Sequence, residues 1–268
     1  MKNIIKISFT VFVLTLIIMF SSASTASASH SWGPYHWART ANPFTLKLGD
    51  NVSSAWDAYL GTTSSNWTLS SVLDTTIVPG LGGRNCQANP GRVEVCNRKY
   101  GSNGWLGLAQ IWINGSHITQ ALTKLNDTYF NTSTYNTPAW RRLVMCQEIA
   151  HDFGLDHQDE IFNNANLGSC MDYTNDPNGG SGGAVNNDPS NEYPNSHDYV
   201  QLETMYAHLD VINTVSQIIA AKNQGEEVSD LRSSWGKAIK QDKLKRDSLF
   251  ERDLSNGNKV FTHVFWAE

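Results

Sequence analysis

The residues best suited to chemistry lie in one short stretch, CQEIAHDFGLDHQDE, which occupies residues 146–160. Gln147 and His151 are four residues apart, so on a helix they share one face. Glu148 lies beside them, and His157 returns to the same place after a glycine ends the helix. Two imidazoles and a third ligand leave one zinc position to water, whose proton Glu148 can accept. We therefore predict a zinc centre with Gln147, His151 and His157 as ligands and Glu148 as the catalytic base.

This stretch resembles the metzincin zinc endopeptidases, and especially their matrixin branch. Their consensus HExxHxxGxxH compares with QEIAHDFGLDH at residues 147–157, and their Met-turn compares with SCMDY at residues 169–173, where Met171 is the Met-turn residue. The resemblance covers about residues 35–210. It implies an α/β (α+β) fold of the zincin type, with a twisted, mostly parallel sheet and an active-site helix. It also implies that residues 107–114 (GLAQIWIN) form the edge strand of a cleft, to which a peptide or protein substrate adds.

Gln147 departs from the consensus, which has histidine at this position. An amide oxygen is a weaker zinc ligand than an imidazole, and three outcomes stay open. Gln147 binds through its side-chain oxygen, or Tyr173 completes the site as a tyrosine does in the astacin and serralysin branches, or the chain binds peptides without cleaving them. Glu148 weighs against the last outcome, because a buried carboxylate is costly without a positive partner.

Other candidates for the missing ligand are weaker. Cys146 lies five residues before His151, about 140° around a helix, and His117 begins a predicted strand. The sequence indicates no partner for four further histidines: His36, His197, His208 and His263. Asp and Asn side chains in residues 172–188 are suited to calcium, although a solvated loop fits the same composition.

The active-site stretch belongs to a predicted helix with Thr137 as its N-cap and Pro138 as its first residue, ending at Gly154. Strands are predicted at residues 44–48, 71–78, 92–96, 106–114 and 117–125. A helix is predicted after residue 51, capped by Asp50 or Asn51, and another after a Gly- and Asn-rich loop at 174–195, capped by Ser196.

The chain divides into three parts by composition. Residues 1–28 have Lys2 and Lys6, an apolar run and an A-x-A site at residues 26–28, which together predict a signal peptide and a secreted protein. Residues 29–210 form the predicted catalytic domain. Residues 211–268 form a C-terminal extension of unknown role, which closes on the strand-like VFTHVFWA at residues 260–267 and is therefore not simply disordered.

Charge and cysteine content narrow the partners and the compartment. The chain has 20 basic and 25 acidic residues, a net charge of −5, which argues against a nucleic-acid or anionic-membrane partner. We expect a monomer that does not bind a membrane once the signal peptide is removed. Four cysteines in an oxidising compartment predict two disulfides, and we favour pairing of sequence neighbours, Cys86 with Cys96 and Cys146 with Cys170.

Overall fold

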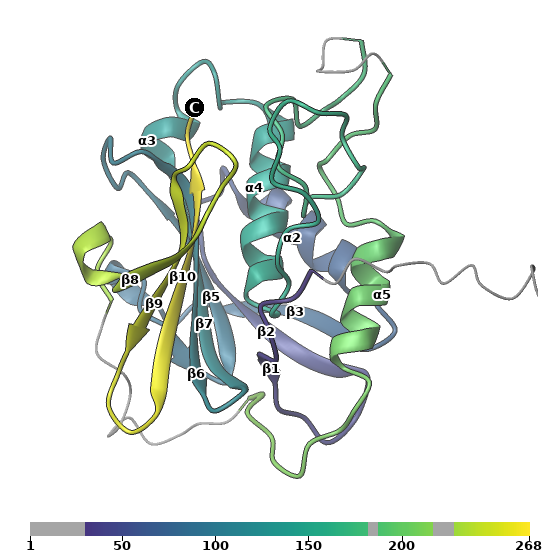
Figure 1. Cartoon of the computed structure of the whole chain (residues 1–268), viewed down its shortest axis with the longest axis vertical. Coiled ribbons are helices and arrows are strands. Elements are labelled where there is room, and N and C mark those ends of the chain that lie inside the picture. Colours follow the sequence, from purple (N-terminus) through teal and green to yellow (C-terminus); the bar gives the residue numbers. More distant parts are fainter. Residues whose placement is uncertain (1–29, 182–186, 217–227) are drawn as a thin grey trace, which may run out of the picture.

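The computed structural model describes residues 30–181, 187–216 and 228–268, so the predicted signal peptide at residues 1–28 lies outside the described residues. A single mixed sheet dominates the fold, and its main path runs in the order β3-β2-β5-β7-β6-β10-β9-β8 (Figure 1). Its strands are β1 (His36–Trp37), β2 (Phe44–Asn51), β3 (Leu73–Pro79), β4 (Asn89–Pro90), β5 (Arg92–Arg98), β6 (Trp105–Asn114), β7 (His117–Asn126), β8 (Lys237–Gln241), β9 (Asp247–Asp253) and β10 (Asn258–Trp266).

The sheet has a parallel half and an antiparallel half. Strands β3, β2, β5 and β7 pair in parallel, whereas β6, β10, β9 and β8 continue the sheet antiparallel. The helices are α2 (Asp57–Trp67), α3 (Asp127–Phe130), α4 (Pro138–His151) and α5 (Ser196–Met205). The predicted α/β class is confirmed. No helix of the described residues has the length and apolarity needed to cross a membrane.

Two apolar cores lie on opposite faces of the sheet because successive strand residues point to opposite sides. On β6, Ile111 and Ile113 join the larger core, which includes Leu143 and Val144 of α4. Leu108 and Trp112, an odd number of residues away, join a smaller core with the C-terminal strands. The larger core therefore holds α4 against the sheet.

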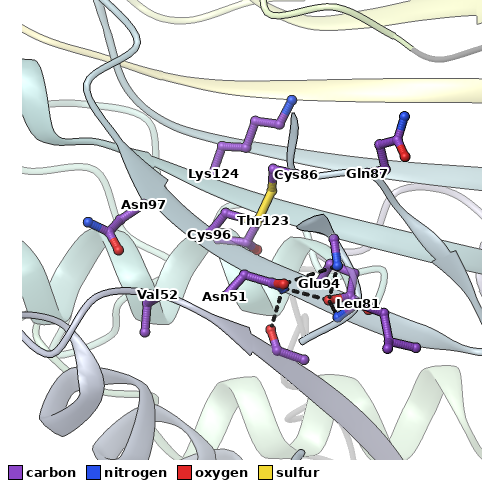
Figure 2. The surroundings of a disulfide bond; sticks show 12 residues. Asn51, Val52, Leu81, Cys86, Gln87, Glu94, Cys96, Asn97, Thr123 and Lys124 are labelled. Carbon is purple, nitrogen blue, oxygen red and sulfur yellow. Dashed lines mark hydrogen bonds between the residues drawn. A yellow bond between two sulfur atoms is a disulfide. The ribbon is translucent and has the colours of Figure 1, made fainter. Parts of the chain in front are cut away.

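The predicted strands are all present, and helix α4 begins with Thr137 as N-cap and Pro138 as predicted. The predicted cap at Asp50 or Asn51 is wrong, since β2 continues through Asn51 and α2 begins only at Asp57. Asn51 instead donates a hydrogen bond of 2.6 Å to the buried carboxylate of Glu94, close to the Cys86–Cys96 disulfide (Figure 2). That long-range contact explains why Asn51 does not cap a helix.

The predicted cap of α5 is also wrong by one residue. Asn195, not Ser196, is the N-cap, and its side chain accepts hydrogen bonds from the backbone N–H groups of His197 and Asp198. Asp198 in turn accepts a hydrogen bond of 2.7 Å from the backbone N–H of Asn195. This reciprocal arrangement is a capping box, with aspartate in place of the usual glutamate.

The C-terminal residues are part of the main sheet. Strand β10 pairs antiparallel with β6 from Asn258 opposite Asn114 to Trp266 opposite Trp105, and Figure 1 shows the yellow C-terminal strands along it. The prediction that residues 107–114 form the edge of the cleft is therefore wrong. The physical reason is that β10 has apolar side chains on both faces, and a position inside the sheet buries both sets and stabilises the fold. The sheet therefore contains strands from both sides of the predicted domain boundary at residue 211.

Candidate metal centre

Helix α4 carries three residues of the centre. Gln147, Glu148 and His151 lie in its last turn and a half, and all three are fully buried. Gly154 follows with a φ of +100°, a conformation that favours glycine, and lets the chain turn back sharply. His157 thereby comes to lie against His151, as the sequence predicts from the glycine.

His151 and His157 direct the same ring atom at each other. The Nδ1 atom of His151 lies 2.8 Å from the carbonyl oxygen of Leu155, and the Nδ1 atom of His157 lies 3.0 Å from a carboxylate oxygen of Glu160. Both oxygens only accept, so each Nδ1 carries a proton and each ring turns its Nε2 toward the other. The two Nε2 atoms are 3.1 Å apart. Either a proton shared between the two nitrogens or a metal ion bound by both accounts for this approach.

His263 is the third histidine of the centre, and the sequence analysis does not find it. It lies on β10, with its ring centroid 3.8 Å from that of His151 and 4.5 Å from that of His157. One ring nitrogen from each of the three histidines falls within 4.8 Å of the others. A signal exists in the sequence, because Phe261, His263 and Phe265 alternate along a strand and share the buried face. Nothing local indicates that this face meets α4.

Glu148 is a buried carboxyl group whose two oxygens have no hydrogen-bond partner among the described residues. On β10, Nδ1 of His263 lies 3.8 Å from one of these oxygens. Burial raises the pKa of Glu148 well above its usual range, and the nearby carboxyl group of Asp152 raises it further. A cation at the histidines would offset this cost and favour the ionised form.

The histidines themselves are good metal donors. Burial lowers the pKa of His151 well below its usual range, with the neighbouring His157 adding to the effect. Burial does the same to His263, where His151 and His157 contribute next. Neutral imidazole is the form that binds zinc, and the Nδ1 contacts to Leu155 and Glu160 fix the tautomer that leaves Nε2 free.

The two remaining predicted ligands are close by and engaged in other contacts. The side-chain N–H of Gln147 donates a hydrogen bond of 2.7 Å to the carbonyl oxygen of Cys170, while its Oε1 has no partner among the described residues. The Tyr173 hydroxyl lies 3.4 Å from Nε2 of His263. Burial raises the pKa of Tyr173 well above its usual range, so the phenol is neutral. Zinc binding by Gln147 or Tyr173 stays a prediction.

The Met-turn candidate and the cysteines lie as the sequence suggests. Met171 is fully buried, and its backbone N–H donates to the hydroxyl of Ser169. Cys146 pairs with Cys170 and Cys86 pairs with Cys96, so both predicted disulfides are confirmed. The first of these bonds ties α4 to the turn at Met171, and it excludes a thiolate of Cys146 as a metal ligand.

The predicted calcium segment, residues 172–188, is described except for residues 182–186. Asp172 accepts hydrogen bonds from Leu167 and Asn191, and Asp188 accepts them from Asn166 and Gly180. These contacts are those of an internally bonded loop. Calcium binding stays a prediction.

The centre is closed to solvent by the two ends of the described chain. Trp32 stacks on His151 with ring centroids 5.2 Å apart, and it also lies against His263 of β10 with ring centroids 5.8 Å apart. On β8, the ammonium group of Lys240 lies 2.7 Å from a carboxylate oxygen of Asp156 and 2.8 Å from one of Glu160. Lys240 thus fastens the C-terminal strands to the loop that carries His157.

The donor set fits zinc. Three imidazoles around a buried carboxyl group match the nitrogen-rich ligation of catalytic zinc sites, in which a glutamate serves as base. A cation bound here would pair with the unpartnered oxygens of Glu148 and with the facing Nε2 atoms. His151, His157 and His263 would hold the ion.

The chain has only a low structural similarity to known proteins. No family model matches the sequence, and no curated protein is similar to it. Among solved structures the chain is similar to myroilysin, with a TM-score of 0.38 and 12% identity over 66% of this chain and 98% of that chain. It is also similar to high choriolytic enzyme 1, a hatching enzyme zinc-protease from Oryzias latipes (medaka fish), with a TM-score of 0.36 and 10% identity over 69% and 98%.

Proposed function

We propose that this chain is a secreted zinc-dependent endopeptidase of the metzincin type, related to the matrixins, and that the closed form described here is latent. The observation that carries the proposal is the 3.1 Å approach of the Nε2 atoms of His151 and His157 beside the unpaired carboxylate of Glu148. In the closed form His263 supplies the imidazole that the consensus has at the position of Gln147. Zinc supplies Lewis-acid activation of water and of a peptide carbonyl group when it is bound.

The residues of the chain have distinct roles in the proposed reaction. Glu148 accepts a proton from the attacking water and returns it to the leaving amine nitrogen, so proton number is conserved. The burial that raises its pKa suits a carboxyl group that must both take and give a proton. Tyr173 packs with its ring 4.1 Å from His157 and keeps that ring in place.

Latency follows from the position of β10. An extended peptide would bind by adding a strand to β6, but β10 takes all the pairing positions from Trp105 to Asn114 on that side. A substrate therefore needs β10 to leave. His263 leaves with it, and the free side-chain oxygen of Gln147 is then the candidate third ligand, as predicted from the sequence.

The test compares zinc content and cleavage of a denatured protein by four forms of the mature chain. These are the unmodified chain, Glu148→Ala, His263→Ala and the double variant Glu148→Ala/His263→Ala. We expect zinc in the unmodified chain, faster cleavage by His263→Ala in zinc-containing buffer, and no cleavage whenever Glu148 is replaced. A zinc-bound protein that cleaves nothing in any form would instead support the rival function, a protein that binds peptides without cleaving them.

A further inference from the structure

A second group of histidines lies outside the centre described above. His36 is on β1, His117 begins β7, and His208 and Asp210 follow α5. The Oδ1 atom of Asp210 lies 3.4 Å from Nε2 of His36, 3.2 Å from Nε2 of His117 and 3.7 Å from Nε2 of His208. The Nε2 atoms of His36 and His208 are 3.1 Å apart. Ligand atoms of His36, His117 and Asp210 therefore all lie within 4.8 Å of one another, and Nε2 of His208 adjoins two of them, those of His36 and Asp210.

These separations are those of a tetrahedral metal site. Ligand atoms about 2.0–2.1 Å from a tetrahedral zinc ion lie roughly 3.3 Å from one another. The three separations from Asp210 Oδ1 and the one between His36 and His208 bracket that value. The rings of His36 and His208 meet at 87°, and those of His36 and His117 at 86°, so the imidazoles approach from different directions. We propose that a zinc ion binds here in tetrahedral coordination by four side chains: His36, His117, His208 and Asp210.

The surrounding contacts are those expected behind metal ligands. The Nδ1–H group of His36 donates a hydrogen bond of 2.7 Å to the carbonyl oxygen of Pro34, which leaves Nε2 as the atom that can bind a metal ion. The other oxygen of Asp210, Oδ2, accepts hydrogen bonds of 2.8 Å and 3.2 Å from the side chain and backbone of Arg39. Oδ1 is thus free to face the histidines, and the carboxylate is held in place.

The site is preformed and open to loading. Backbone hydrogen bonds of 2.9 Å join Asp210 to Arg39 and Thr214 to Ala38, which fix the loop after α5 to the segment after β1. The side chain of His208 is 54% exposed and that of His117 is 26% exposed, whereas His36 and Asp210 are nearly buried. An ion can enter from solvent at His208 and then reach the inner ligands.

A site with four protein ligands and no water is the pattern of structural zinc. The ion would join β1, the start of β7 and the loop after α5. Because β1 follows the segment whose Trp32 stacks on His151, the second ion would also brace the N-terminal cover of the first centre. The two sites share no residue, so each can be emptied separately.

The experiment counts zinc per molecule in the mature chain after loading with zinc chloride and removal of excess by gel filtration. The forms compared are the unmodified chain, His117→Ala/His208→Ala, His157→Ala, and Leu209→Ala as the control. Leu209 lies between two of the ligands and is 55% exposed, so its replacement leaves the site intact. Circular dichroism checks that each form is folded, and His208→Ala alone serves if the double variant does not fold.

We expect two zinc ions in the unmodified chain and in Leu209→Ala, and one ion in each histidine variant. One ion that is lost in His157→Ala but kept in His117→Ala/His208→Ala would overturn the second site and leave the proposed function standing. One ion that is lost in His117→Ala/His208→Ala but kept in His157→Ala would support the second site and count against the first centre. A metal-free chain would overturn both, and the second group would then be a hydrogen-bonded network in which His208 donates to His36 and His117 donates to Asp210.

Discussion

His151 and His157 show how a few hydrogen bonds decide the chemistry of a site at the scale of single residues. Each ring has its Nδ1 engaged with an oxygen acceptor, so only Nε2 can serve as a ligand atom. Glu160 is the charged acceptor of the two, and it holds His157 from behind. An anionic partner of this kind increases the basicity of the ring and orients it toward the metal.

Replacing Glu160 with glutamine should therefore weaken zinc binding. The amide keeps an acceptor oxygen but loses the negative charge, and we expect roughly a 10-fold loss of zinc affinity, at the lower end of the effects of such partners. Competition with a chromogenic chelator measures this loss. Glu192→Gln is the matched control, because Glu192 pairs with Arg142 and belongs to no histidine cluster of the described residues. Equal zinc affinity in the two variants would contradict the role of Glu160.

Gly107 is a second residue whose type is set by the centre. A Cβ atom at this position of β6 would lie 2.7 Å from both Cγ and Oε1 of Glu148, and 2.7 Å from a methyl group of Val144. Alanine would therefore force α4 away from the sheet. We expect Gly107→Ala to lower the free energy of unfolding by about 1–3 kcal/mol and to reduce zinc affinity as Glu148 moves.

Urea denaturation measures the effect of Gly107→Ala. Gly61 on α2 is the control, since a Cβ atom there meets nothing within 4 Å. Gly61→Ala should raise the free energy of unfolding by about 0.5–1 kcal/mol, because alanine loses less backbone entropy in a helix. Similar stability changes in the two variants would mean that α4 and β6 are not in close contact.

At the scale of elements, the C-terminal strands decide whether the centre is accessible. Strand β10 covers β6, and Lys240 on β8 contacts Asp156 and Glu160 on the loop that carries His157. The lysine is 34% exposed, so each ion pair contributes modestly. Together the two pairs hold the edge of the C-terminal strands against the metal loop.

Lys240→Ala should loosen these strands and raise the cleavage rate several-fold, since displacement of β10 is the step that admits substrate. Lys259→Ala is the matched control: Lys259 is equally exposed and pairs with Glu251 and Asp253, which belong to the C-terminal strands themselves. Initial rates on a denatured protein substrate, with Glu148→Ala as the background, give the comparison. An unchanged rate in Lys240→Ala, or an equal rise in Lys259→Ala, would contradict the proposal that the ion pairs of Lys240 hold the C-terminal strands in place.

The elements also show what the sequence can and cannot reveal. Helix α4 was predictable because its cap, its proline and its glycine stop are local signals, and the disulfides followed from cysteines that are close in sequence. The pairing of β10 with β6 was not predictable, since the paired residues lie about 150 positions apart in the sequence. A short stretch of sequence does not show with which strand, or in which register, it pairs. His263 was missed for this reason, although alternation places it on a buried face.

At the scale of the whole molecule, the first and last segments of the described residues meet at the centre. The N-terminal segment brings Trp32, the middle of the chain brings α4 and its loop, and the C-terminal strands bring His263. A metal ion that bridges such distant segments binds the folded chain only, so its binding free energy adds to stability. The unfolded chain has no comparable site.

Zinc should therefore raise the thermal stability of the mature chain. Free zinc at 100 times the dissociation constant of one site adds about 2.7 kcal/mol to the free energy of unfolding, and a second occupied site adds to this. Calorimetry with zinc and with a strong chelator measures the difference in Tm. A Tm that is the same in both buffers would mean that zinc does not bind the folded chain.

The most direct test of the central claim is an anomalous difference map, collected at the zinc absorption edge, from crystals of the mature chain. We predict a peak within about 2.0–2.1 Å of one ring nitrogen from each of His151, His157 and His263, with β10 paired to β6. A map with no peak at these residues, or a zinc ion there that His263 does not contact, would contradict it.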